Sequence, residues 1–244
     1  MDSRFAVLAL ASLAPLTVAA PVRADGLQGR WSLGLQAGSD AELSGSVHQG
    51  GTGTVLGLPT EVQERSFHQV FGPNFRGQLS VGYGVEPRGE VFLRGSYYKM
   101  SSSPLQVGTV AGLPLSADFS PYKEWGLEAG YRHHFSEGRL RPYAALVAGL
   151  RFISEMPSTF SVSEAGVVVP DVPFYDKSTV GVFGADIGLA YALSEGVAVG
   201  LETGPRYQTA PGRLNGLAGT GLDSINDTGS RWSMPIVATL SFRF

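Results

Sequence analysis

The residues of this sequence best suited to catalysis are its four histidines. Nucleophilic hydrolysis needs a serine, a histidine and a carboxylate within hydrogen-bonding reach of one another. His134, Ser136 and Glu137 offer these three types in one short stretch, HFSE. That stretch lies in a short connection between two predicted strands. We therefore interpret it as a turn and not as a catalytic group.

Two further histidines, His48 and His68, lie in the first long connection. Asp40, Glu42 and Glu64 are close to them in the sequence. This set contains the residue types of a metal site or of an aspartate/histidine protease. The spacing matches no specific motif, so we interpret both residues as solvated loop histidines.

The stretch DSINDTGSR at 223–231 resembles a calcium-binding loop only weakly. It lacks alternating oxygen ligands and a terminal glutamate, and a turn through Asn226 and Gly229 is the simpler interpretation. The chain contains no cysteine, which excludes disulfides, thiolate-bound metals and a cysteine nucleophile. The sequence therefore predicts no catalytic residue, no cofactor, no metal site and no enzymatic activity.

Charged residues follow a clearer pattern, in which a glutamate precedes an arginine by four positions at three places. In an extended strand such positions share a face but lie roughly 13 Å apart, too far to pair directly. Pairing across neighbouring antiparallel strands is possible, and one register sets Glu90 against Arg132 and Arg94 against Glu128. We expect these charges to form an ion-pair network that fills an enclosed interior. The alternative is a wet interior in which they specify register weakly. The predicted network consists of Glu90, Arg94, Glu128, Arg132, Asp186, Glu202 and Arg206.

The elements that would position these charges are segments in which apolar and other residues alternate, as they do in half-buried strands. Glycine is abundant in them, at 33 residues in the whole chain. Six segments are clear and two, 30–38 and 141–153, are weaker. In 141–153, Tyr143 is out of phase with Leu146 and Leu150, which predicts a bulge or a different register. The clear segments are 75–85, 90–98, 124–134, 181–193, 197–208 and 231–244.

The connections between these segments alternate between short and long. The short ones are 86–89, 135–140 and 194–196, and the long ones are 39–74, 99–121, 154–178 and 209–230. Short turns at one end and long loops at the other are typical of outer-membrane barrels. The sequence predicts an all-β fold: a single eight-stranded antiparallel up-and-down transmembrane β-barrel with four long extracellular loops. The 154–178 loop can extend the barrel as a hairpin.

The apolar face of each strand has aromatic residues near both ends and aliphatic residues between them. Aromatic rings favour the headgroup level of a bilayer, so this order predicts a lipid-facing surface with two girdles. A soluble sandwich, the alternative, would not sort its aromatics by height. Pro205 and Pro235 cannot donate to a sheet ladder, and we expect a gap or bulge between the last two strands. The predicted girdles are Trp31, Tyr83, Tyr131, Tyr191, Phe242 and Phe244 near the short turns, and Phe75, Tyr97, Trp125, Phe183, Tyr207 and Trp232 near the long loops.

The eight segments, RPYAALVAGL at 141–150, VAVGLETGPRY at 197–207 and the terminal LSFRF together resemble the small outer-membrane β-barrels of the OmpA/OmpX type. The resemblance covers residues 26–244. It implies a protein of the outer membrane of a Gram-negative bacterium, with both termini in the periplasm. It also implies that Leu240, Phe242 and Phe244 form the signal by which the barrel-assembly machinery recognises its clients. The expected partners are this machinery and periplasmic chaperones, outer-membrane lipid and lipopolysaccharide, and an extracellular ligand of the loops.

The first 24 residues have the pattern of a cleaved signal peptide, with Arg4, an apolar stretch and a Val22-Arg23-Ala24 cleavage site. The barrel domain would then comprise residues 25–244. A net charge of −3 without a basic stripe argues against nucleic-acid binding. We expect a surface or structural protein with a plugged lumen. The alternatives are a narrow channel or carrier for small molecules, and a barrel enzyme that modifies lipid A or cleaves proteins.

Overall fold

The computed structural model describes residues 26–211, 221, 222, 225 and 229–244. The predicted signal peptide and most of the 223–231 turn lie outside the described residues. Within the described part of the chain, no helix has the length and apolar character to cross a membrane.

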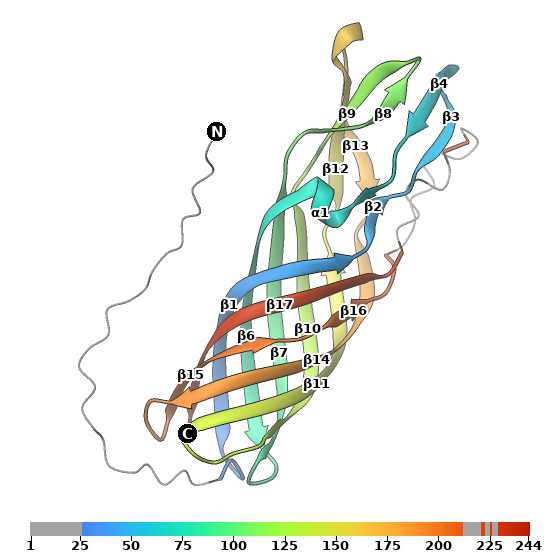
Figure 1. Ribbon diagram of the computed structural model, residues 1–244. Helices are drawn as coiled ribbons and strands as arrows, with labels where there is room; N and C mark the ends of the chain where they lie inside the picture. The colour runs from blue at the N-terminus through green and yellow to red at the C-terminus, as the bar shows by residue number, and fades with distance from the viewer. Residues whose placement is uncertain (1–25, 212–220, 223–224, 226–228) are drawn as a thin grey trace, which may run out of the picture.

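The main sheet is a closed antiparallel barrel (Figure 1). Consecutive strands pair around it, and β17 closes it by pairing with β1 from Ser32↔Arg243 onward. Because β15 and β16 are two pieces of one barrel strand, the barrel has eight strands, as predicted. In order, they are β1 (Trp31–Ser44), β6 (Phe71–Gly84), β7 (Gly89–Ser102), β10 (Tyr122–His134), β11 (Leu140–Ile153), β14 (Ser178–Ala192), β15 (Val197–Thr203) with β16 (Arg206–Gln208), and β17 (Arg231–Arg243).

Strand β11 corrects the prediction of a bulge around Tyr143. Its register with β10 and with β14 runs without a shift. Tyr143 is buried in the lumen, whereas Leu146 and Leu150 on the other face are exposed. The phase of the strand is therefore regular, and a large aromatic residue simply occupies an inward position.

The two prolines produce a gap but no bulge. The ladder between β15 and β17 ends at Thr203↔Ile236, and the ladder between β16 and β17 resumes at Arg206↔Ser233 in the same register. Pro205 lies in this interruption, where it has no N–H to donate. Pro235 stays within β17 and is paired in register with Asp40.

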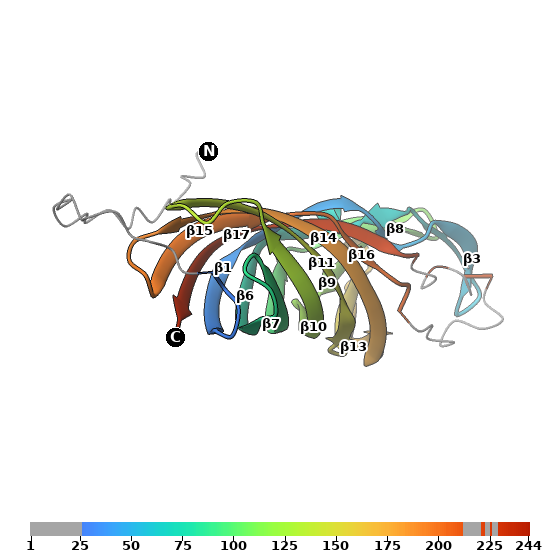
Figure 2. The same cartoon turned by 90° about the horizontal axis from the view of Figure 1, so that it is seen from below.

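A second, six-stranded sheet continues beyond the barrel at the end that carries the long connections, which we call the loop end. Much of the predicted loop sequence is therefore regular structure. In both views β3 lies at this end and the C-terminus toward the other, which we call the turn end (Figures 1 and 2). The strand order is β13 (Val167–Tyr175), β12 (Met156–Val162), β9 (Leu113–Phe119), β8 (Leu105–Val110), β4 (Leu58–Val62) and β3 (Gly51–Val55).

Three small elements connect this sheet to the barrel. Strands β2 (Ser46–His48) and β5 (Arg65–Ser66) form a two-stranded sheet, and helix α1 (Phe67–Val70) follows β5 directly. Ser66 and the side chain of Gln69 form a capping box at the start of α1. A short 3₁₀ helix, η1 (Ser163–Ala165), forms the tip of the β12–β13 hairpin. The barrel strands also run past the predicted boundaries, since β1 reaches Ser44 and β7 reaches Ser102.

Candidate functional site in the barrel lumen

The charged network begins near the turn end with the pair that the predicted register places together. Glu90 of β7 and Arg132 of β10 are opposite each other, and their side chains are 2.8 Å apart. The same ladder sets Arg94 opposite Glu128. Arg132 also reaches Glu202 at 3.3 Å, which connects this pair to the far side of the lumen.

Arg94 is the centre of the network. It contacts Glu202 at 2.7 Å and Asp186 at 3.2 Å, and Glu128 at 3.6 Å. Asp186 in turn accepts two hydrogen bonds from Arg206, at 2.6 and 2.8 Å. The structure therefore brings all seven predicted network residues together.

The network is larger than the sequence analysis predicted and extends toward the loop end. Arg151 pairs with Glu128 and, at 3.4 Å, with Glu124. Glu124 lies 3.6 Å from Arg76 and 3.4 Å from Arg231. Only Glu124 shares a strand, β10, with predicted members, and the others lie on strands that contribute none to the predicted network. Their position on the face opposite the apolar residues of each strand was the signal that could have found them. The additional members are Asp40, Glu42, Arg76, Glu124, Arg151 and Arg231.

The network residues are buried, so their desolvation cost must be offset by their pairing. Arg94, Glu128 and Arg151 are at most 2% exposed. Desolvating charges to this extent costs several kcal/mol per ion, roughly offset when each group is paired. The cations among the residues above are all arginines, whose planar fork forms bidentate pairs such as Arg76 with Asp40. Buried pairs of this kind often add little net stability.

A cluster of buried apolar residues covers the network at the loop end. We call it the apolar cap. It is built from β2, α1, the outer parts of the barrel strands and the second sheet. Arg231 lies over the ring of Phe67 at 4.8 Å, and Arg76 lies over Tyr98 at 4.6 Å, so the cap and the network are in direct contact. The cap consists of Val47, Phe67, Val70, Phe71, Tyr98, Met100, Val107, Ala117, Phe119, Tyr122, Ile153, Met156, Phe174, Tyr175 and Val180.

The two loop histidines differ from each other. His68 is exposed, as predicted, and bonds to Ser66. The prediction of a solvated His48 is wrong, because His48 is 2% exposed and contacts the rings of Phe119 and Phe174 in the cap. Burial lowers the pKa of His48 below its ordinary value of 6.5. Folding of the second sheet over β2 creates this environment, which the local sequence does not specify.

The carboxylates close to these histidines in the sequence bind other groups. Asp40 is paired with Arg76, Glu42 accepts a hydrogen bond from Tyr98, and Glu64 accepts one from Ser46. In the described ranges, no group of three or more histidines and carboxylates is placed to hold a metal ion. His134, Ser136 and Glu137 lie at the end of β10 and in the turn before β11, in agreement with the turn interpretation.

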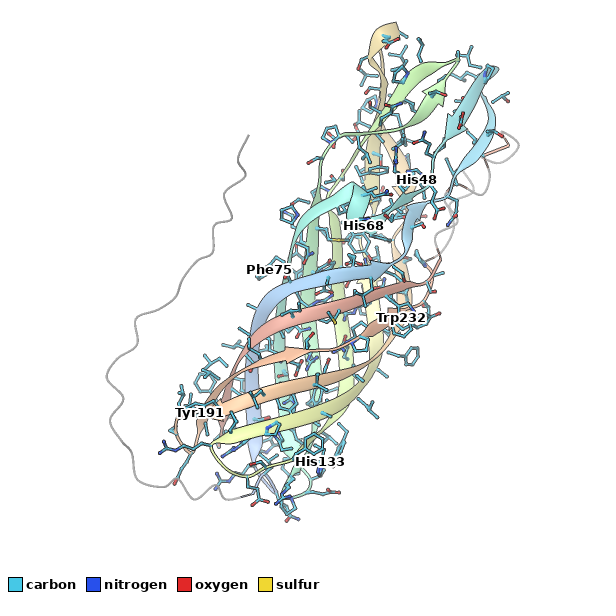
Figure 3. The ribbon with its side chains drawn as sticks, viewed as in Figure 1. His48, His68, Phe75, His133, Tyr191 and Trp232 are labelled. Carbon is cyan, nitrogen blue, oxygen red and sulfur yellow. The ribbon has the colours of Figure 1, made fainter. Side chains whose placement is uncertain are left out.

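The outer surface of the barrel is apolar. Leu79, Leu127 and Leu201 are at least half exposed at mid-height. Aromatic residues flank them, with Trp31 beside Tyr83 at the turn end and Tyr97 beside Trp125 at the loop end. In Figure 3, Phe75 and Trp232 lie toward the loop end and Tyr191 toward the turn end. An aliphatic band between two aromatic zones is suited to a bilayer.

A closed barrel with an apolar exterior and a charged interior defines the class: a membrane-spanning eight-stranded β-barrel. A lipid environment tolerates such a barrel because closure leaves no unpaired strand edge. The fold class is that of the small outer-membrane barrels.

Comparison with known proteins finds similarity in fold and not in sequence. No protein-family model matches the chain, and no curated protein matches its sequence. The outer membrane protein OprG from Pseudomonas aeruginosa aligns with 91% of this chain and 99% of its own, at 12% identity and a TM-score of 0.45. Neisserial surface protein A aligns with 89% and 98%, at 15% identity and 0.44. The outer membrane protease OmpT from Escherichia coli aligns with 88% and 97%, at 9% identity and 0.42.

Proposed function

We propose that this protein is a non-enzymatic outer-membrane barrel that transports no solute and presents its loop-end sheet at the cell surface. The observation that supports the proposal is that buried ion pairs such as Arg94–Glu202 lie inside the barrel and that the apolar cap lies over them at the loop end. A solute would have to separate buried charges and then displace packed aromatic side chains.

The two layers block different classes of solute. The network leaves its charged groups engaged with one another, which removes the solvated path that ions require. The cap has no charged lining to guide an ion, because its members are apolar side chains and tyrosines. These features favour a structural and surface role over the alternative of a narrow channel.

Conductance of single molecules in a planar bilayer tests the closed lumen. We expect no steady current from the folded full-length barrel at either polarity. A stable open state would contradict the proposal and favour the channel. Arg88→Ala/Glu137→Ala, which removes an exposed pair in the turns, is a matched control that should not change the record.

The proposed orientation places the second sheet outside the cell and both termini in the periplasm. Leu56, at the β3–β4 turn, is 98% exposed and lies far from the membrane band. Because the chain contains no cysteine, single-cysteine variants give unambiguous labels. A membrane-impermeant maleimide applied to intact cells should label Leu56→Cys and should not label Arg139→Cys, in the turn between β10 and β11. The reverse pattern would overturn the orientation.

The proposal includes three elements of biogenesis and environment. A signal peptide of 24 residues would direct export. The barrel-assembly machinery and periplasmic chaperones would receive the chain through Leu240, Phe242 and Phe244. Lipid and lipopolysaccharide would surround the apolar band. An extracellular ligand of the second sheet is the remaining proposed partner.

Deletion of residues 2–24 tests the signal peptide. Export of the shortened chain would contradict the assignment of these residues as a leader.

A further inference from the structure

A recess at the turn end contains polar groups that neither the lumen network nor the cap uses. It lies where the chain entering β1, the β6–β7 turn, the β10–β11 turn and the end of β17 meet. His134, Arg141, Arg243 and Arg88 contribute side chains to its lining. Three of these four are permanent cations, so the recess is strongly basic.

His134 is the unusual member of this group. It is the last residue of β10 and only 3% exposed. Neither of its ring nitrogens has a hydrogen-bond partner within the described part of the chain. One face of the ring packs beside Tyr143, with the ring centroids 5.3 Å apart. An imidazole always carries at least one N–H, so this buried side chain, which lines the recess, has a donor that no described protein group receives.

The surrounding charges select the chemistry of a ligand. Arg132 and Arg141 are the cations that act most strongly on the His134 ring. Arg141 is itself 6% exposed, and its Nε donates to the Gly138 carbonyl, a neutral acceptor. The Nε of Arg243 is buried without a hydrogen-bond partner. A metal cation would be repelled here, and a water molecule would satisfy His134 without neutralising the arginines.

One carboxylate, Glu137, also lines the recess. It is 2.8 Å from Arg88 and is engaged in that exposed pair. The charges of Arg88 and Glu137 therefore neutralise each other. His134, Arg141 and Arg243 remain as the groups that can donate hydrogen bonds to a ligand. Arginine forks form charge-assisted hydrogen bonds to oxyanions, and an imidazole N–H is a further donor.

We propose that the recess binds a small oxyanion of the phosphate class through His134, Arg141 and Arg243. Bound there, the anion would connect the β10–β11 hairpin of the barrel to its closing strand. The entering segment is already attached to the first hairpin, where the Leu27 amide donates to the Pro87 carbonyl at 2.8 Å. The anion would thus stabilise the seam at which the first and last strands meet. This inference goes beyond the proposed surface role and does not depend on it.

The test follows the His134 ring signals by NMR in the full-length barrel folded in a maltoside detergent. Inorganic phosphate is titrated at constant ionic strength, with chloride as the balancing anion. We expect a saturable shift of the His134 signals. Arg141→Gln should weaken the apparent affinity about tenfold, the value of one charge-assisted hydrogen bond. Arg139→Gln, the same charge change at an exposed position of the same turn, should leave the affinity unchanged.

A second arm separates free phosphate from a lipid headgroup. Phosphatidylglycerol is added to the same micelles without inorganic phosphate. A His134 shift with either ligand supports the site and identifies its source. No saturable shift with either, or an equal shift with chloride alone, would overturn the proposal. His134→Phe, which keeps a ring beside Tyr143, should fold and should lose the phosphate-dependent rise in melting temperature. A rise that persists in this variant would also count against the site.

Discussion

Replacement of Arg94 by methionine tests the lumen network most directly. Arg94 contacts Glu202 at 2.7 Å, Asp186 at 3.2 Å and Glu128 at 3.6 Å, and it is 1% exposed. Arg94→Met fills a similar volume but removes the cation, so three buried carboxylates lose a shared partner. Removing one partner of a buried ion pair costs about 3–5 kcal/mol. Each carboxylate keeps a second arginine, so we expect the lower value, about 3 kcal/mol.

The assay is reversible urea unfolding in lipid vesicles, followed by the fluorescence of the exposed tryptophans Trp31, Trp125 and Trp232. Arg88→Met is the matched control, since the Arg88–Glu137 pair is almost half exposed and should lose less than about 1 kcal/mol. Adding Glu202→Gln to Arg94→Met removes one buried charge that has lost its 2.7 Å partner and should recover part of the loss. A free energy of unfolding for Arg94→Met within about 1 kcal/mol of the unmodified protein would refute the view that the network is buried and tightly coupled.

Three further changes address the exterior, the cap and the C-terminus. Leu201 is 64% exposed in the aliphatic band, so Leu201→Arg should lower the free energy of unfolding in vesicles by about 2–4 kcal/mol, whereas Leu201→Ile should change it little. Burial lowers the pKa of His48 below 6.5, so in acid the unfolded chain binds more protons than the folded chain. The contribution of His48 to the free energy of unfolding should be fully present above pH 6.5. Below that pH it should fall by up to about 1.4 kcal/mol per pH unit. The unfolding midpoint of His48→Phe should lack this component, and an unchanged pH dependence would argue against a buried neutral histidine. Deletion of Phe244 should reduce the amount of heat-modifiable folded barrel in the outer membrane, and an undiminished yield would contradict its role in assembly.

The apolar cap explains why the loops were predicted less well than the barrel. In lipid, alternation with a period of two is compulsory, so the strands are visible in the sequence. Beyond the membrane, β8, β9, β12 and β13 pack around the aromatic cluster. No lipid surface there requires every second residue to be apolar, so their sequences alternate less strictly. The sequence therefore predicts a solvated His48, and the second sheet buries it.

The sequence by itself determined the eight barrel strands, their closure, the lipid-facing side of every strand except β11, and the register that pairs Glu90 with Arg132. Each of these follows from the period of a strand or from pairing between neighbours along the chain. Only the tertiary structure decided which charges meet across the lumen, such as Arg94 with Glu202, 108 positions away in the sequence. It also placed Tyr143 among those charges, with its hydroxyl donating to Glu202 at 2.9 Å. Such contacts join barrel strands that are not adjacent, so they form only when the closed barrel brings the inward faces of those strands together.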